Sequence, residues 1–170
     1  YPELEEEIPG AIGPEGEILD RASSRLASLR NQIRTLQNRL RERLERMIHT
    51  EFNRYLQDPI VTIRQGRYVL PVKQEYKAQV AGLVHDQSAS GQTLFVEPMA
   101  IVELNNQLRV AQREEEEEVA RILAQLSALV AQEAEKLGYT LEALAQFDLV
   151  VAKARLAKKM RAEAPILNSE

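Results

Sequence analysis

The chain has 170 residues, 44% of them hydrophobic and 28% charged, so it can bury a core, and wholesale disorder is excluded. Aromatic residues make up only 5% and Trp is absent, which favours long helices over a β-sandwich. The absence of Cys excludes disulfides, thiolate zinc sites and a cysteine nucleophile. No apolar run approaches the ~20 residues that span a membrane, and the chain opens at Tyr1 rather than Met. We therefore expect a soluble, cytoplasmic piece of a larger protein.

Charge is segregated along the chain, although the net charge of −4 excludes a generally basic nucleic-acid binder. Residues 15–57 hold nine Arg against six acids, residues 59–98 hold four bases against three acids, and residues 99–137 hold eight acids against four bases. Basic and acidic segments of this kind attract each other when they pack antiparallel. The first interpretation is helix pairing within the chain, and the second is a local basic surface for phosphates.

Residues 1–14 are rich in Glu, Pro and Gly, and we interpret them as a linker or loose lead-in. A helix is predicted to start near residues 14–17 and to continue to residue 57, because neither Gly nor Pro occurs between 17 and 57. Apolar residues that alternate three and four positions apart predict a heptad seam for helix pairing. The seam consists of Leu19, Ala22, Leu26, Leu29, Ile33, Leu36 and Leu40.

Residues 58–98 are predicted to form a β-rich segment, which we call the β tip. Asp58-Pro59 ends the helix, and a period of two with β-branched residues follows. Residues 60–63 and 68–72 are predicted to form a hairpin in which Gly66 supplies the positive φ of a tight turn. A second strand pair is predicted at 82–85 and 93–96.

A second long helical stretch is predicted to run from residue 99 to Leu137, with Gly138 as its left-handed cap. The five consecutive acids at 114–118 interrupt its apolar stripe, and we expect them to be solvated. A last helix is predicted from Thr140, as N-cap, to a point before Pro165. Residues 15–57 and 99–163 would then lie antiparallel as a helical lever with the β tip at its far end. The predicted fold is mainly α, with a small antiparallel β insertion.

Residues for catalysis are not apparent in the sequence. The phosphate-loop, dinucleotide-binding, zinc-protease and nucleophile-elbow motifs are all missing. His49 has no metal-ligating neighbour at helical spacing, and the adjacent His85 and Asp86 point to opposite faces of a strand. We therefore expect no catalytic residue and no metal site.

The loop at 87–92 is a different case, because it contains hydroxyl residues and Gly91 and belongs to a segment with several basic residues. Such a loop is either an ordinary polar hairpin loop or a contact to phosphates that does not read bases. The predicted nucleic-acid contacts are Arg64, Arg67, Lys73, Lys77, Gln87, Ser88, Ser90 and Gln92.

Three strings carry a resemblance to a known family: GRYVLPVK at 66–73, HDQSASG at 85–91 and TLFVEP at 93–98. With Leu104-Asn105-Asn106 and the stretches at 18–23 and 147–155, they resemble the middle region of the second bacterial MutS branch, often called the MutS-two endonuclease. The resemblance covers residues 15–165. It implies a lever with a reduced clamp, taken from a dimeric, ring-shaped ATPase whose clamps contact duplex backbone nonspecifically.

The resemblance also implies suppression of homologous recombination through duplex or branched DNA and, in some bacteria, rescue of collided ribosomes. ATP, Mg²⁺ and nuclease activity are implied for domains of the full-length homodimer that lie C-terminal to this region, so we expect no cofactor and no catalysis in this fragment. Our leading hypothesis is therefore a non-catalytic lever and clamp that binds DNA. One alternative is a coiled-coil dimerisation module that pairs through the seam. The other is a tip that contacts ribosomal RNA, which would place the protein at the ribosome rather than the nucleoid.

Overall fold

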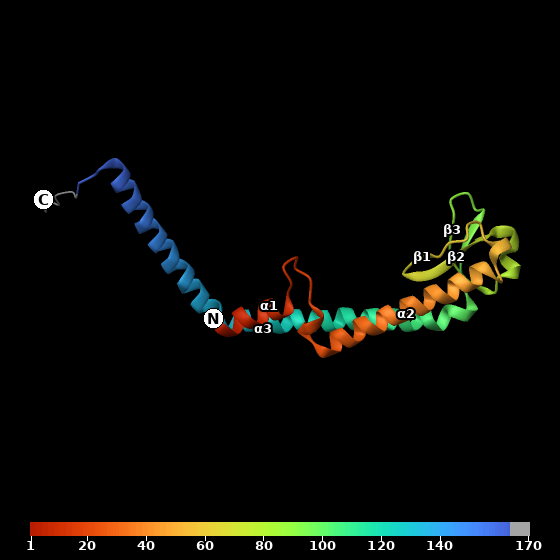
Figure 1. Ribbon diagram of the computed structural model, residues 1–170. Coiled ribbons are helices and arrows are strands. Elements are labelled where there is room, and N and C mark those ends of the chain that lie inside the picture. Colours follow the sequence, from red (N-terminus) through yellow and green to blue (C-terminus); the bar gives the residue numbers. More distant parts are fainter. Residues whose placement is uncertain (164–170) are drawn as a thin grey trace. The chain divides into compact units, whose positions relative to one another are not determined.

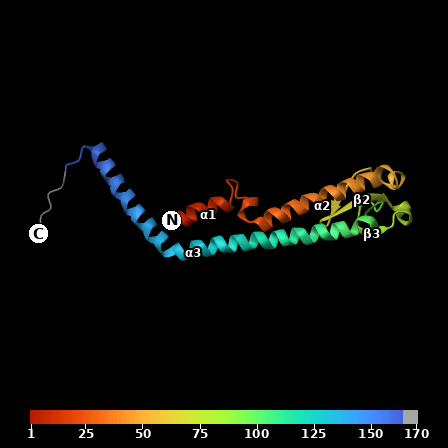
Figure 2. The same cartoon turned by 60° about the horizontal axis from the view of Figure 1, so that its bottom comes forward.

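The computed structural model describes residues 1–163, which divide into one unit from Tyr1 to Leu123 and a second that starts at Ala124. In the first unit, α2 (Ser24–His49) lies beside the first turns of α3 (Val102–Met160), and a sheet lies at one end of this helix pair (Figures 1 and 2). The sheet has four antiparallel strands. The predicted combination of a mainly helical chain with a small antiparallel sheet is confirmed.

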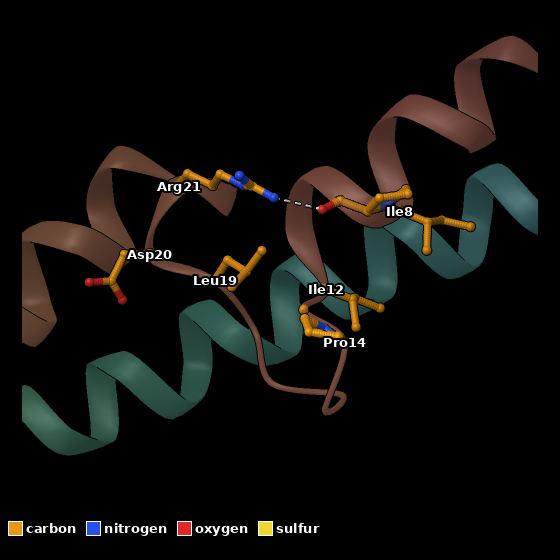
Figure 3. A pocket seen from close by; sticks show the side chains of 8 residues that line it. Ile8, Ile12, Pro14, Leu19, Asp20 and Arg21 are labelled. Atoms are coloured by element: carbon orange, nitrogen blue, oxygen red, sulfur yellow. Dashed lines mark hydrogen bonds between the residues drawn. The ribbon is translucent and has the colours of Figure 1, made fainter.

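Residues 1–14 differ from the predicted loose lead-in, because Pro2–Ala11 form helix α1. Pro2 occupies the first turn, where its missing N–H costs nothing, and Glu3 and Glu5 complement the positive end of the helix dipole. Arg21 fixes the other end, donating a hydrogen bond to the carbonyl oxygen of Pro9 (3.0 Å; Figure 3) and another to that of Gly10 (3.1 Å). Carbonyls at a helix end lack helical partners, so these bonds hold α1 in place.

Helix α2 begins later than predicted, at Ser24, and a 3-10 turn at Asp20–Ala22 precedes it. Ser23 is the reason, because its Oγ accepts a hydrogen bond from the backbone N–H of Leu26 (3.0 Å) and caps the helix. Leu19 of the predicted seam is therefore outside the helix and only half-buried. The other predicted leucines and Ile33 lie on α2 and are at most 8% exposed.

Helix α2 also ends earlier than predicted, at His49 rather than residue 57, so it is about 39 Å long at 1.5 Å per residue. Packing overrides helix propensity here. Phe52 and Tyr55 pack against the core as the chain turns back, and Leu56 is buried and bridges to Val72.

The strands are β1 (Thr62–Arg64), β2 (Arg67–Lys73), β3 (Gly82–Gln87) and β4 (Thr93–Pro98), in the spatial order β1-β2-β4-β3. Both predicted hairpins are confirmed. Gln65 and Gly66 join β1 to β2 with φ values of 51° and 73°, the two left-handed residues that a tight hairpin turn requires. A β-bulge at His85 interrupts the β3–β4 pairing.

Helix α3 follows the 3-10 turn Met99–Ile101 and continues through Gly138 to Met160. The predicted cap at Gly138 and the predicted helix start at Thr140 are therefore wrong. Thr140 instead donates a hydrogen bond to the carbonyl of Lys136 (2.8 Å) inside the helix. Pro165 lies outside the described residues.

Two polar contacts set the antiparallel register of α2 and α3 in the first unit. Arg30 donates to Glu115 (2.7 Å), and Ser23 donates to Glu118 (2.6 Å). The acidic run is thus not simply solvated, because Glu118 is 2% exposed and Glu115 is half-buried. One ion pair, between Arg30 and Glu115, joins the basic and acidic segments within the chain, in line with the first interpretation.

The core lies where the helix pair meets the sheet. Leu36, Leu40 and Leu44 of α2 join Leu108 and Ala111 of α3 in one buried cluster. The sheet supplies further members of the same cluster: Tyr68, Leu70, Val72, Leu94 and Val96. This packing fixes the β tip on the helices in the first unit.

In the second unit, the described part of α3 from Ala124 presents many apolar side chains to solvent. They are Tyr139, Leu141, Leu144, Phe147, Leu149, Val150, Leu156 and Met160, each between 54% and 70% exposed. No helix in the described chain is both long and apolar enough to be a membrane span.

Candidate nucleic-acid interface

Arg64 lies on the outer part of the β tip with its guanidinium already in contact with neighbours. The guanidinium carbon lies 4.0 Å from the centre of the Phe95 ring, a cation–π arrangement. Its Nε is 3.4 Å from a carboxylate oxygen of Asp86. The side chain is still 37% exposed, so Arg64 keeps a face toward solvent.

The Arg67 side chain is engaged mainly by contacts within the protein. Its Nη1 donates to the buried carboxylate of Glu97 (2.7 Å), and its Nη2 donates to Asn106. Glu97 also accepts from Asn105 (2.7 Å) and contacts Nε2 of His85. This network joins three strands to α3, and it leaves the Arg67 side chain only 19% exposed. His85 therefore helps to hold the hairpin together.

Asn105 extends the network to the backbone. Its amide accepts from the N–H of Tyr68 (3.1 Å) and donates to the carbonyl of the same residue (3.0 Å). These groups belong to β2 beyond the point where β4 pairs with it, so a buried side chain replaces the missing strand. Sequence reasoning missed this role because nothing local marks Asn105 as a strand partner.

The structure brings Lys73 and Gln92 together. They line a polar cleft of about 690 Å³ with Gln57, Gln74 and Glu75, and the Gln74 N–H donates to the Gln92 carbonyl (3.0 Å). Lys73 lies 5.9 Å from the centre of the Tyr76 ring. Lys77 is exposed on the adjacent 3-10 helix, Gln74–Gln79. In the described chain, the side chain of neither lysine forms an ion pair or a hydrogen bond.

The loop at 87–92 is closed by its own hydrogen bonds. The Gln87 side chain donates to the carbonyl of Gly91 (3.0 Å), and Ser88 Oγ accepts from the Thr93 N–H (3.1 Å). Ser90 lies 3.3 Å from Ser88, hydroxyl to hydroxyl, and is exposed. Gly91 has a φ of 74°, which suits glycine at this turn. Ser90 and Gln92 are exposed, and so is Gln87, although its amide is engaged by Gly91.

The seam residues Leu26, Leu29, Ile33, Leu36 and Leu40 are buried within a single chain. The apolar stripe of α2 is thus covered without a second chain. Ile33, Leu36 and Leu40 lie in the same buried cluster as Leu108 and Ala111 of α3. Pairing between chains through this seam stays a prediction.

An apolar pocket of about 690 Å³ lies between α1 and the following loop, lined mainly by Ile8, Pro9, Ile12 and Leu19 (Figure 3). Asp20, at its edge, is engaged by Arg30 (2.7 Å). Among residues 1–163, no three His, Cys, Asp or Glu side chains form a cluster suited to a metal ion.

Three relatives decide the family. The chain is 53% identical to an endonuclease MutS2 of Pelotomaculum thermopropionicum over 170 residues, which is 99% of this chain and 22% of the relative. It is 56% identical to an endonuclease MutS2 of Symbiobacterium thermophilum over 167 residues, or 98% of this chain and 21% of the relative. The endonuclease MutS2 of Bacillus cytotoxicus is 53% identical over 169 residues, again 99% of this chain and 22% of the relative. The chain belongs to the MutS2 family.

This MutS2 chain spans about a fifth of the length of the curated relatives that it matches. No family model matches the sequence. The strings that carried the resemblance lie in the β tip and its support, where GRYVLPVK forms β2 with its preceding turn and TLFVEP forms β4.

Proposed function

We propose that this chain is the lever-and-clamp part of a MutS2 protein of the bacterial cytoplasm. The antiparallel pair of α2 and α3 carries the β tip, and the tip contacts the phosphate backbone of duplex or branched DNA. In the full-length homodimer, these contacts would suppress homologous recombination by holding branched intermediates.

The observation that carries this proposal is the pair of unpartnered lysines beside the polar cleft. Lys73 and Lys77 have no carboxylate partner in the described chain, whereas Arg64 and Arg67 do. Three amide residues, Gln57, Gln74 and Gln92, line the cleft with Lys73, and Glu75 is its one acidic lining residue. Cations and amides of this kind bind phosphate oxygens and read no base sequence. The relatives' name, endonuclease, describes an activity on nucleic acid.

The proposal assigns no catalysis to this chain. His85 is the nearest approach to a catalytic base, but it contacts a carboxylate that Arg67 and Asn105 also bind. Cleavage, ATP and Mg²⁺ would belong to the four-fifths of the relatives that lie outside this chain. The predicted contact set of eight residues is retained; Lys77, Gln87, Ser90 and Gln92 are its exposed members, and Lys73 is half-buried at the cleft.

The test is the salt dependence of DNA binding by the full-length protein that contains this segment. Each phosphate contact contributes about 0.9 to the slope of log affinity against log salt for duplex DNA. Replacing Lys73 and Lys77 with Gln should therefore lower that slope by about 2, equally for unrelated sequences. The charge-matched control replaces Lys153 and Lys158 with Gln and should leave the slope unchanged.

An unchanged slope in the Lys73→Gln/Lys77→Gln variant, with duplex and four-way-junction DNA still bound, would show that the tip is not the contact. Duplex RNA of the same sequence serves as a second ligand. A-form and B-form duplexes present the same backbone charges, so charge alone does not distinguish them. Binding that prefers the RNA and depends on the two lysines would therefore favour the ribosomal alternative.

A further inference from the structure

Helix α2 carries seven arginines and no lysine over its 26 residues. The arginines near its start are used inside the molecule, since Arg30 binds both Asp20 and Glu115 and Arg34 lies 3.9 Å from Asp20. The arginines near its end are different. Arg39 and Arg43 are exposed, and within residues 1–163 their side chains form no ion pair or hydrogen bond.

Arg39, Arg43 and Arg46 follow one another at spacings of four and three residues, and we call them the arginine row. At 100° per residue they fall within roughly 60° of arc on one side of α2. Arg43 and Arg46 line a cleft of about 520 Å³ with Met47, Thr50, Glu51 and Ala100. Arg46 donates only a long hydrogen bond, 3.4 Å, to the backbone carbonyl of Glu42. The row is thus an open surface beside a shallow cleft.

The charged side chains of this surface are unpaired within the described chain. Like charges four residues apart on a helix repel by a few tenths of a kcal/mol. The carboxylates of Glu42 and Glu45 line a second cleft together with Arg46, and Glu51 lines the first. None of the three forms an ion pair with the row in the described chain. An external anion would remove the repulsion, and the planar guanidinium, with two parallel donors, suits phosphate oxygens.

We propose that the arginine row is a second phosphate-binding surface of this chain, on α2 and separate from the β tip. Its partner is the phosphodiester backbone of a nucleic-acid duplex. The row extends about 10 Å along the helix axis, with spacings of about 6 and 4.5 Å, and one strand of a duplex presents a phosphate every 3.4 Å along its axis. Several phosphates of one strand therefore fall within reach of the three side chains. The inference rests on the proposed function in one respect, the choice of a nucleic acid as the class of partner.

The experiment uses the full-length protein with a fluorescent 40-base-pair DNA duplex and an RNA duplex of the same sequence. Arg43→Gln should lower the slope of log affinity against log salt by about 1, and the triple variant Arg39→Gln/Arg43→Gln/Arg46→Gln by about 3. The matched control is Arg41→Gln, which removes one exposed and unpaired arginine from the opposite side of the same helix and should leave the slope unchanged. The two duplexes show whether DNA or RNA is the better ligand for the row.

Two results would overturn the inference: a triple variant with the wild-type slope, or equal effects of Arg41→Gln and Arg43→Gln. Tighter, row-dependent binding of polyglutamate than of either duplex would also overturn it, in favour of an acidic protein partner. The lysine variant of the tip separates the two proposals. A slope lowered only by the lysine changes supports the tip and rejects the row, and a slope lowered only by the arginine changes does the reverse.

Discussion

Glu97 lies at the centre of the polar cluster that joins β2, β3 and β4 to α3, and its side chain is fully buried. Its oxygens contact Arg67, His85 and Asn105, so its charge is balanced by one permanent cation and two further hydrogen-bonding groups. A carboxylate in this position holds the strands by geometry more than by net attraction, because its desolvation offsets much of the Coulomb energy. Removing only one partner from such a cluster lowers the free energy of unfolding by far more than the intact cluster raises it.

Glu97→Gln should therefore lower the free energy of unfolding by about 3 kcal/mol, since Arg67 loses its counter-charge while most of its side chain stays buried. Urea denaturation followed by circular dichroism measures the change. Glu117→Gln is the control, because Glu117 is exposed and pairs only with Arg113 on the same helix. Equal stability of the two variants would contradict the structural role assigned to Glu97.

Glu118 is the second buried carboxylate, and its environment makes a pH-dependent prediction. Hydrogen bonds from Arg121 and Ser23 lower the pKa of Glu118 from its ordinary value of 4.5 to about 2. A carboxyl group with a lowered pKa in the folded state stabilises the fold above its unfolded pKa, and this stabilisation is lost as the pH falls toward the folded pKa. The wild type should thus be more stable than Glu118→Gln at pH 6, and the difference should shrink between pH 4.5 and pH 2.

Thermal unfolding of both proteins at several pH values measures that difference. Glu116→Gln, in the same acidic run but exposed to solvent, should match the wild type at pH 6. A stability difference between wild type and Glu118→Gln that is the same at pH 2.5 and pH 6 would rule out the proposed contribution of the Glu118 charge.

At the scale of elements, Gly138 gives a direct test of helix α3. A glycine at a left-handed cap resists replacement by Ala, whereas a glycine inside a helix is destabilising by roughly 0.5–1 kcal/mol relative to Ala. In α3 Gly138 is interior, and a Cβ added there meets no atom within 4 Å. Gly138→Ala should therefore raise helicity and stabilise the protein, while Gly66→Ala, at a φ of 73°, should destabilise it by about 1 kcal/mol. If Gly138→Ala destabilised the protein, the result would support the helix end that the sequence alone predicts and contradict a continuous α3.

The elements that were predictable from the sequence are those specified by neighbouring residues. The hairpin turn at Gln65 and Gly66 needs only two left-handed residues between β-branched runs, and the seam from Leu26 to Leu40 needs only its spacing. Helix boundaries depended on distant partners. Ser23 caps α2 while it also binds Glu118, 95 residues away, and Phe52 ends the helix by packing on the core.

The candidate site likewise has features that were predictable from the sequence and features that depend on distant partners. Charge and the small residues of the loop indicate a polar tip, and the exposure of Lys77 and Ser90 agrees with that prediction. The register of β2 on β4 places Lys73 opposite Thr93 and hence beside Gln92. The engagement of Arg67 with a buried Glu97, 30 residues away, has no local signal in either segment. An arginine in a basic stretch of sequence is not by itself an available cation.

At the scale of the whole molecule, the two units differ in how their apolar side chains are covered. In the first unit, α2 buries eight residues of its apolar stripe. In the second, Leu141, Leu144 and Phe147 are among eight apolar side chains that are more than half exposed. Helix formation without packing is marginal in water, because propensity alone contributes little per residue. The helical hydrogen bonds beyond residue 138 thus lack the support that α2 has.

We therefore predict that, in the isolated 170-residue chain, backbone amides at 141–160 exchange with deuterium faster than those at 33–48, by on the order of tenfold or more. In a protein of the relatives' full length the same amides should become protected, because the four-fifths of such a protein outside the matched segment would supply surface that covers the apolar side chains. Hydrogen exchange read by mass spectrometry gives both values from overlapping peptides. Peptides from α2 provide the internal reference, since their protection should be similar in both proteins. Fast exchange at 141–160 in both proteins would mean that this apolar surface stays uncovered in the full-length protein as well.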